Sequence, residues 1–576
     1  MNEILHRNKT ESSPKLKSSN NIPACELLNN HFVNIGRNIS ANAQTTQTTV
    51  DSFTDHPANV SLYLANTSDL EIENSVKMMK IPASGYDEIP VKVLKYVITI
   101  ISPVLTFIIN LSFRTGIFPD KLKIARVTPI FKSGDPNDVN NFRPVSVLSI
   151  LSKIFERAMC TRLTAFLNDN KLLSPNQHGF LQSRSTETAL FSFTKTVNRC
   201  LENKEHTIGV FLDFSKAFDS LDHAVLIKKL ENIGVRGMPL KLFKSYLVNR
   251  KQMVTYNKLT SSLQTISTGV PQGSILGPLL FLIYINDICN VSRKLSYVLF
   301  ADDTNIIMSH RNLPQLFTIL NEELSKLNEW VTANKLKLNF DKTHYVYFKR
   351  RKTNTNLPNL YIGNKEIIRS HTTKFLGIII DENLGWKEHI NSICIKLSRL
   401  CGIIYHTRHM LTPDALKSVY YSLVYPHLTY GVVAWGNTYQ TFKKPLQVIQ
   451  KRIIRTITFT NRYSSTRTIF ASLRLMKVDE MYSYFATLFV FKSINNFNRF
   501  TDFEVFNHDH NTRGQHVNMA VPRSTTVHAQ RHILYSGPVL WNDLPPRLKQ
   551  ITNLNSFKYN LKKKYLTTTN DMQSTN

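Results

Sequence analysis

Two adjacent carboxylates, Asp302 and Asp303, are the residues of this sequence best suited to chemistry. They lie between two apolar, strand-forming stretches, residues 297–301 and 304–307. A strand, a turn and a strand in this order predict a β-hairpin with the acidic pair at its tip. Neighbouring negative charges repel, and a divalent cation that takes hard oxygen ligands, such as Mg²⁺, relieves that repulsion. Taken alone, the pair is also compatible with a solvated turn.

A third carboxylate has the same setting upstream. The apolar stretch 208–212 is typical of a buried strand and ends directly before Asp213. Two strands that deliver acidic side chains to one place can bind two metal ions, which hold the attacking and leaving oxygens of a phosphoryl transfer. The sequence therefore predicts a two-metal site.

The elements that must position these carboxylates follow from hydrophobic spacing. Further strands are expected at residues 125–131, 346–348 and 373–380, with a turn at 132–136. Helices are expected at residues 25–39, 70–79, 90–113, 148–168, 187–202 and 313–334, followed by mostly helical, basic sequence from 386 to 495. Because strands and helices mix without regular alternation, the predicted fold class is α+β.

The charge of the chain indicates a polyanionic partner. The 576 residues include 71 Lys and Arg against 41 Asp and Glu, which gives a formal net charge of +30. Nucleic acid is the partner that best offsets such self-repulsion, an acidic membrane surface is the second, and a basic surface without a partner is the third. The six cysteines form no CxxC pair, which excludes a zinc ribbon and fits a reducing intracellular compartment.

No segment is expected to enter a membrane. Residues 1–21 are polar and charged, unlike a secretory signal. The longest uncharged run, residues 97–113, contains Pro103 and Asn110 and is shorter than the roughly 20 residues that span a bilayer. We expect this run to be part of a buried helix.

Several motifs occur in a fixed order along the chain. They are Asp213 to Phe218, Gly269-Val270-Pro271-Gln272-Gly273-Ser274, Phe300-Ala301-Asp302-Asp303 and Lys374-Phe375-Leu376-Gly377. In this order they resemble a reverse transcriptase. Three further stretches of sequence resemble non-LTR retrotransposons of the jockey type: Asn141-Phe142-Arg143-Pro144-Val145-Ser146, Gln177-His178-Gly179-Phe180 and Ser274-Ile275-Leu276-Gly277-Pro278-Leu279-Leu280-Phe281. The resemblance extends over residues 70–564.

The resemblance implies a right-hand polymerase with fingers, palm and thumb. The boundaries that it implies are a polar, partly disordered linker at 1–69, an N-terminal extension and fingers at 70–205, a palm at 206–380, a helical basic thumb at 381–495, and a C-terminal region with a basic tail at 496–576. The reverse transcriptase domain itself is expected at about 105–380.

The resemblance also implies roles for individual residues. Two Mg²⁺ ions, or Mn²⁺ in their place, would be held by Asp213, Asp302, Asp303 and the backbone carbonyl of Phe214. Lys342 would protonate the leaving pyrophosphate, and Phe218 would exclude a 2′-hydroxyl. The other implied contacts are to the nucleotide by Lys132, Arg143, Phe218, Gln272 and Gly273, to the primer by Leu376 and Gly377, and to nucleic-acid phosphates by Lys451, Arg452 and Arg455.

The expected activity is extension of a DNA primer 3′-hydroxyl on an RNA template from dNTPs. A separate endonuclease is expected as a further partner, since the residues ahead of the resemblance are too few for one. The expected location is the nucleus, with a cytoplasmic RNA–protein complex. One alternative is a decayed or domesticated copy that only binds nucleic acid, which the retained carboxylates disfavour. Another is a group II intron maturase or a prokaryotic reverse transcriptase, which the run Gly537-Pro538-Val539-Leu540-Trp541-Asn542 disfavours.

Overall fold

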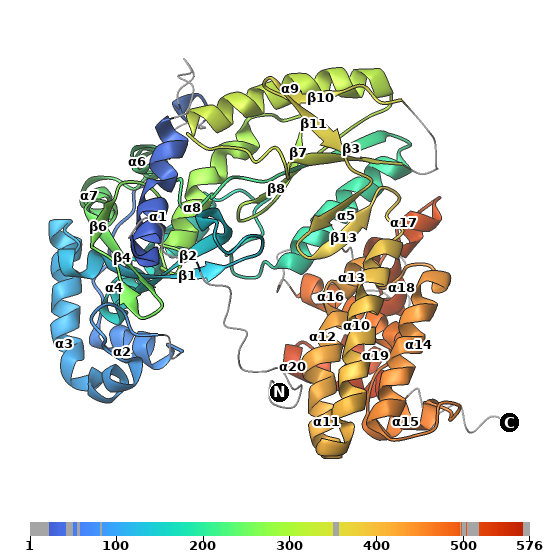
Figure 1. Cartoon of the computed structure of the whole chain (residues 1–576). Coiled ribbons are helices and arrows are strands. Elements are labelled where there is room, and N and C mark those ends of the chain that lie inside the picture. Colours follow the sequence, from blue (N-terminus) through green and yellow to red (C-terminus); the bar gives the residue numbers. More distant parts are fainter. Residues whose placement is uncertain are drawn as a thin grey trace.

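The chain has two β-sheets with surrounding helices in its first part and is almost entirely helical in its last part (Figure 1). The predicted α+β class is therefore confirmed. The computed structural model describes residues 16, 22–41, 50–53, 58–80, 83–349, 356–495, 497, 503 and 518–567.

A six-stranded sheet carries the three carboxylates. Its strand order is β10-β11-β9-β3-β8-β7, and every neighbouring pair is antiparallel except β9 with β11. Ile208 and Val210 of β3 belong to one hydrophobic core and Phe211 to another, so both faces of the sheet are covered. The strands are β3 (His206–Leu212), β7 (Ser296–Phe300), β8 (Asp303–His310), β9 (His344–Phe348), β10 (Leu360–Ile362) and β11 (Lys365–Arg369).

The second sheet has five strands in the order β2-β1-β4-β5, with β6 paired to β4. Strands β1 and β2 form an antiparallel hairpin, and β1 runs parallel to β4. The strand predicted at 125–131 is confirmed as β1, whereas β2 and β4 were not predicted. The strands are β1 (Ile124–Phe131), β2 (Phe142–Leu148), β4 (Arg250–Tyr256), β5 (Leu259–Thr260) and β6 (Gln264–Ile266).

Helix α1 (Ala24–Ala41) confirms the helix predicted at 25–39, and it packs on the second sheet. Leu28 and Phe32 share a small core with Val254 of β4. The Asn29 side-chain amide donates to the Ser262 carbonyl at 2.8 Å. This helix is therefore part of the folded body, although the sequence predicts mainly a linker here. The rest of that predicted linker lies largely outside the described residues.

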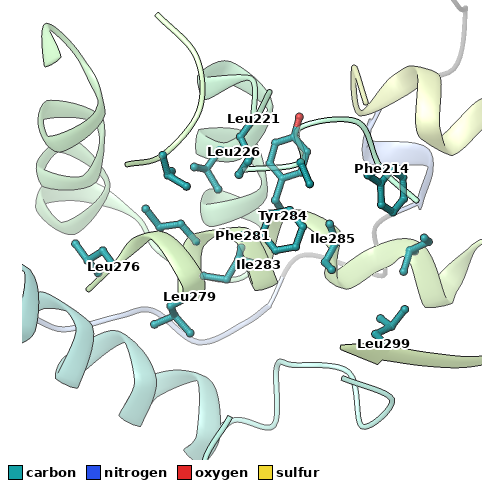
Figure 2. Packing of buried hydrophobic residues seen from close by; sticks show 14 of the residues in the cluster. Phe214, Leu221, Leu226, Leu276, Leu279, Phe281, Ile283, Tyr284, Ile285 and Leu299 are labelled. Atoms are coloured by element: carbon teal, nitrogen blue, oxygen red, sulfur yellow. The ribbon is translucent and has the colours of Figure 1, made fainter. Parts of the chain in front are cut away.

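Helix α8 (Gly277–Ile285) belongs to the same hydrophobic core as Phe214, the second residue after β3. All its residues except Pro278 are buried, and it is apolar on every side, as expected for a helix surrounded by protein. Figure 2 shows this helix among Phe214, Leu221 and Leu226 of the same core. Because Phe214 directly follows Asp213, this packing fixes the place where the carboxylate leaves the strand.

The other helices of the first part pack on the sheets or on one another. Those predicted at 70–79, 148–168, 187–202 and 313–334 are confirmed to within two residues at either end, whereas α6 and α7 were not predicted. These helices are α2 (Asp69–Lys77), α3 (Val91–Thr115), α4 (Ile150–Asp169), α5 (Thr186–Glu202), α6 (His223–Asn232), α7 (Gly237–Leu247) and α9 (Leu313–Ala333), with short 3₁₀ turns at Val50–Phe53, Asp120–Lys123, Val139–Asn141 and Asn286–Asn290.

Helix α3 is only half buried, so the expectation of a buried helix is wrong for its outer face. One side packs on α2, α4 and α7. The other side exposes Tyr96, Ile100 and Phe107, by 87%, 76% and 61%. In the described part of the chain, α3 is the one helix long and apolar enough to cross a membrane by length and composition.

The strand predicted at 373–380 is in fact a hairpin of two strands. Strand β12 (Thr372–Phe375) and strand β13 (Ile378–Asp381) pair antiparallel. Leu376 and Gly377 form the turn between them, with φ of +48° and +82°. Residues 375–380 form an unbroken run without polar side chains, which is why the sequence pattern did not reveal the reversal.

The region after this hairpin is helical, as predicted, and its core also includes α5 and one face of the six-stranded sheet. The predicted basic tail at 558–564 is part of a packed helix, since Phe557 and Leu561 are fully buried. The helices are α10 (Lys387–Thr407), α11 (Pro413–Val419), α12 (Tyr425–Thr429), α13 (Val432–Trp435), α14 (Gln440–Ile457), α15 (Arg467–Leu473), α16 (Val478–Ile494), α17 (Val527–Arg531), α18 (Ile533–Asn542), α19 (Pro546–Lys549) and α20 (Leu554–Thr567), with a 3₁₀ turn at Arg408–Met410 and a π-turn at Tyr420–Val424.

Candidate active site

The predicted acidic hairpin is confirmed, and it brings the three carboxylates together. Strands β7 and β8 pair up to Phe300 opposite Asp303, which leaves Ala301 and Asp302 as the two turn residues. The other neighbour of β8 is β3, whose last residue Leu212 pairs with Thr304. Asp213 therefore leaves β3 beside the acidic turn.

Gln177 braces this turn from outside the hairpin. Its buried side-chain oxygen accepts hydrogen bonds from the N–H groups of Gly179 at 2.8 Å and Ala301 at 3.0 Å. Residue 179 must be glycine, because a Cβ there would lie 2.4 Å from the Ala301 nitrogen. The motif at 177–180 was visible in the sequence, but its role was not, since Gln177 and Ala301 are 124 residues apart.

The carboxylates repel one another. Asp302 and Asp303 reach solvent but have protein around them, and this loss of hydration raises the pKa of both side chains. The negative charges of Asp302 and Asp213 raise the pKa of Asp303 further, to about 6. A cation bound between these groups would lower the pKa values again, because it favours the ionised form.

The donor set suits a hard divalent cation, since carboxylate oxygens are the ligands that Mg²⁺ prefers. Among the described residues, however, no three Asp, Glu, His or Cys side chains are placed closely enough to hold a metal ion. The Lys342 ammonium instead lies 3.7 Å from Asp213 Oδ2. Joint metal binding therefore requires the side chains to turn toward one another.

Four cationic side chains form a cluster beside the carboxylates: Lys132 and Arg143 lie near Asp302, Lys342 lies near Asp213, and Lys216 lies near these cations. Burial lowers the pKa of Lys132, and the nearby positive charges of Arg143, Lys216 and Lys342 lower it further. Lys132 follows strand β1 and Arg143 lies in β2, so the hairpin of the second sheet delivers both. Such a concentration of positive charge is suited to a polyanion such as a triphosphate.

Lys216 is a member of this cluster that the sequence analysis missed. It lies three residues after Asp213, and its ammonium is 3.4 Å from the Asn140 carbonyl. Burial lowers its pKa, as does the charge of Arg143, whereas Asp219 raises it. The signal was its position in the sequence, only three residues after Asp213.

Phe218 is partly buried, and two other rings fix its position. It stacks on Phe281 of α8, with ring centroids 4.5 Å apart and planes inclined by 22°. It also meets Phe180 edge-on at 6.3 Å. The residue is therefore both a core contact and a partly exposed surface, and its predicted exclusion of a 2′-hydroxyl stays a prediction.

Gln272 is held by the segment that follows Asp213. Its side-chain amide donates to both carboxylate oxygens of Asp219, each at 2.8 Å. Burial raises the pKa of Asp219 to about 6, although this hydrogen bond opposes the effect. Gly273 has φ of +127°, and a Cβ there would lie 2.4 Å from the Ser146 carbonyl, so only glycine fits. Asp219 is a second residue that the sequence analysis missed.

The turn at Leu376 and Gly377 is anchored to the C-terminal helical region. The Tyr430 hydroxyl donates to the Leu376 carbonyl at 2.7 Å. A Cβ at Gly377 would contact the Tyr430 ring at 3.4 Å. The predicted primer contact of this turn stays a prediction, and the anchored geometry is compatible with it.

The three basic residues predicted to contact nucleic acid on α14 differ in their surroundings. Lys451 and Arg452 are exposed, as a phosphate contact requires. Arg455 is half buried, and its Nε and Nη2 donate to the Ser464 carbonyl at 3.0 and 2.8 Å. Arg455 therefore holds the loop that follows α14, a use of the guanidinium that was not predicted.

Comparison with known proteins agrees with this geometry. Residues 130–380 match the family described as reverse transcriptase (RNA-dependent DNA polymerase). The chain is 29% identical over 449 residues to the probable RNA-directed DNA polymerase from transposon BS of Drosophila melanogaster, covering 76% of this chain and 49% of that protein. It is 28% identical over 444 residues to the RNA-directed DNA polymerase from mobile element jockey of the same species, covering 75% and 48%.

A further relative is the Pol polyprotein from type-1 retrotransposable element R1 of Bradysia coprophila, 27% identical over 377 residues, which are 64% of this chain and 37% of that protein. The chain spans about half the length of the first two of these relatives. Whereas the basic residues of α14 lie outside residues 130–380, the three carboxylates and the four cations near them lie inside. This part of the chain is therefore a reverse transcriptase domain, and the chain is a relative of the polymerases of jockey-type and other non-LTR mobile elements.

Proposed function

We propose that this chain is an RNA-directed DNA polymerase that extends a DNA primer on an RNA template. The observation that carries the proposal is the placement of Asp213 and the Asp302-Asp303 turn on adjacent strands, with four cations near them. Carboxylates that attract metal ions and cations that attract phosphates are the two requirements of nucleotidyl transfer.

In this proposal the described regions take the parts of a right-hand polymerase. The second sheet with its helices, in residues 70–205 together with β4, would form the fingers. The six-stranded sheet, in residues 206–380, would form the palm, and the helices of residues 381–495 the thumb. The relatives' names, which are those of RNA-directed DNA polymerases, support this reading.

Each residue then has a task. Asp213, Asp302, Asp303 and the Phe214 carbonyl would hold two Mg²⁺ ions, or Mn²⁺; when bound, these ions supply charge neutralisation and activation of the primer hydroxyl. Lys132, Arg143 and Lys216 bind the triphosphate, and Lys342 Nζ gives a proton to the leaving pyrophosphate. Such general acid help is worth about 10²–10⁴-fold.

The proposed substrates are an RNA template, a DNA primer and dNTPs. Lys451 and Arg452 on α14 contact the phosphate backbone, and the turn at Leu376 and Gly377 positions the primer end. The proposal also includes a primer hydroxyl made by a separate endonuclease, and synthesis in the nucleus from RNA–protein complexes formed in the cytoplasm.

Primer extension by the purified protein tests the proposal. A labelled DNA primer on a defined RNA template should be lengthened when dNTPs and Mg²⁺ are present and should stay unchanged after chelation of the metal. A protein that binds this primer–template but adds no nucleotide with Mg²⁺ or Mn²⁺ would favour the decayed, binding-only alternative.

Binding of RNA should weaken steeply with salt. Lys and Arg side chains that neutralise phosphates release counterions, so the logarithm of the affinity falls with the logarithm of salt concentration, by about 0.7 for each single-strand phosphate contacted. A filter-binding titration from low to moderate salt measures this slope. A slope near zero would contradict the nucleic-acid interpretation of the +30 charge.

Replacement of Gln177 by Met should slow primer extension by about 10- to 100-fold, because the side chain keeps its volume but two buried N–H groups lose their acceptor. The lost hydrogen bonds would loosen the acidic turn. Steady-state kcat/KM for one dNTP measures the effect, with the melting temperature recorded beside it. The exposed Gln182→Met variant is the matched control, and equal rates for the two variants would refute the bracing role.

A further inference from the structure

The end of α10 that lies away from the β12–β13 hairpin carries a second basic surface. Helix α10 starts beside β13 and has 21 residues, so it extends about 30 Å at 1.5 Å per residue. Figure 1 shows this far end beside α11 and α15, at the lower edge of the helical region. The surface is formed there by the last turn of α10, the turn Arg408–Met410 and the loop 458–466.

Exposed aromatic rings gather around one arginine on this surface. The Arg408 guanidinium lies over the ring of Tyr405 at 4.4 Å and over that of Phe459 at 5.0 Å. His409 meets Phe459 edge-on at 5.1 Å. Tyr405 and Phe459 are half exposed, and nearby in the same loop Tyr463 is 88% exposed. We call Tyr405, Arg408, His409, Phe459 and Tyr463 the tip surface.

The loop that presents these rings is held in a defined shape. Arg455 donates two hydrogen bonds to the Ser464 carbonyl, and the Thr460 N–H donates to the Arg455 carbonyl at 3.1 Å. Phe459 itself has φ of +55°, which is uncommon for a bulky residue. The loop is fixed in a shape that leaves apolar rings exposed to solvent. Exposed rings forgo the favourable free energy of burial unless a partner covers them, so this arrangement indicates a binding surface.

The charge around the tip surface indicates what it binds. Between Glu388 and Asp479 the sequence has one acidic residue, Asp414. The same stretch has thirteen basic ones, of which Lys443 and Lys477 are paired with Asp479 and Glu480 just beyond it. The other eleven are Lys396, Arg399, Arg408, Lys417, Lys444, Lys451, Arg452, Arg455, Arg462, Arg467 and Arg474. This imbalance favours a polyanion over a protein surface of mixed charge.

We propose that the tip surface binds an unpaired nucleic-acid strand, whose bases stack on Tyr463, Phe459 and the Arg408–Tyr405 pair. Aromatic rings and arginine planes bind unpaired bases of any sequence, whereas the bases of a duplex are already stacked on one another. The distance of about 30 Å from the β12–β13 hairpin separates this surface from the reacting nucleotide. Its task is therefore to hold a strand rather than to take part in chemistry.

A binding assay without dNTPs tests this proposal independently of polymerase activity. Fluorescence anisotropy measures the affinity of the full chain for a blunt hairpin duplex and for the same duplex with a single-stranded extension of about ten nucleotides. The measured quantity is the ratio of the two affinities. One arm uses an RNA extension and one a DNA extension, which shows which strand the surface prefers.

Tyr463→Ala and Phe459→Ala should each lower this ratio by about tenfold, the usual effect of removing one stacked ring. The affinity for the blunt duplex should stay unchanged. Arg408→Lys should lower the ratio too, because lysine keeps the charge but loses the planar stack. Tyr96→Ala, on the other side of the molecule, removes an equally exposed ring and is the matched control.

The results can also overturn the proposal. A wild-type ratio near one, or a ratio that Tyr463→Ala and Phe459→Ala both leave unchanged, would show that no strand is held there. An unchanged ratio combined with a lower sedimentation coefficient of the free variants would assign the rings to protein contact instead. Equal losses in Tyr96→Ala would show a general effect of removing exposed rings.

Discussion

Asp213→Asn should lower the rate of primer extension by at least about 10³-fold, since each carboxylate that we propose to hold a metal ion contributes several kcal/mol in the transition state. Asp302→Asn and Asp303→Asn should have comparable effects. An amide has nearly the shape of a carboxylate but carries no charge, so it cannot offset the charge of a divalent ion. RNA binding should change little, because the basic residues are untouched.

The structure gives a reason to expect equal effects from residues that are far apart in the sequence. Asp213 and the acidic turn lie on adjacent strands, and the negative charge of Asp213 raises the pKa of both Asp302 and Asp303, so the three carboxylates act as one charged group. Single-turnover extension with saturating dNTP measures the rate, and filter binding measures RNA affinity. Asp414→Asn, an exposed carboxylate on α11, is the matched control. Extension by Asp213→Asn at near wild-type rate would refute the metal assignment.

Local sequence patterns determined which elements of the fold and of the site could be predicted. The strands around Asp213 and Asp302 have clear apolar runs with an acidic residue at the end, and the hairpin follows from them. Helix α8 was not predicted, because nine consecutive residues that are apolar on every side show no helical period. The reversal at Leu376 and Gly377 was hidden for a similar reason, since an unbroken run without polar side chains continues through the turn.

The contacts that hold the site in place could not be predicted from spacing. Gln177 reaches a turn 124 residues away, and Asp219 pairs with Gln272 across 53 residues. Neither pairing leaves a local signal in the sequence, because both depend on how the two sheets and α8 pack. Lys216 is different, since its closeness to Asp213 in sequence was sufficient to suggest it. Long-range polar pairs are therefore the part of such a site that can be identified only once the fold is known.

Phe218→Val should admit ribonucleotides while much of the deoxynucleotide activity is kept. The ring lies five residues after Asp213 and is fixed against Phe281 of α8, so its position relative to Asp213, the proposed metal ligand, is rigid. A fixed ring beside the sugar leaves no room for a 2′-hydroxyl, because close-packed atoms have little slack. Valine removes several carbon atoms and opens that space without touching a metal ligand.

The measurement is kcat/KM for dGTP divided by that for GTP, in the wild type and the variant. We expect this ratio to fall at least about tenfold, which corresponds to 1.36 kcal/mol of lost discrimination. Loss of the ring stack should also lower stability by about 0.5–1.5 kcal/mol, so both proteins are assayed well below the melting temperature of the variant. Phe218→Tyr keeps the ring and should keep the ratio. If valine leaves the ratio unchanged, the stacking on Phe281 is the whole role of Phe218, and sugar selection depends on another residue.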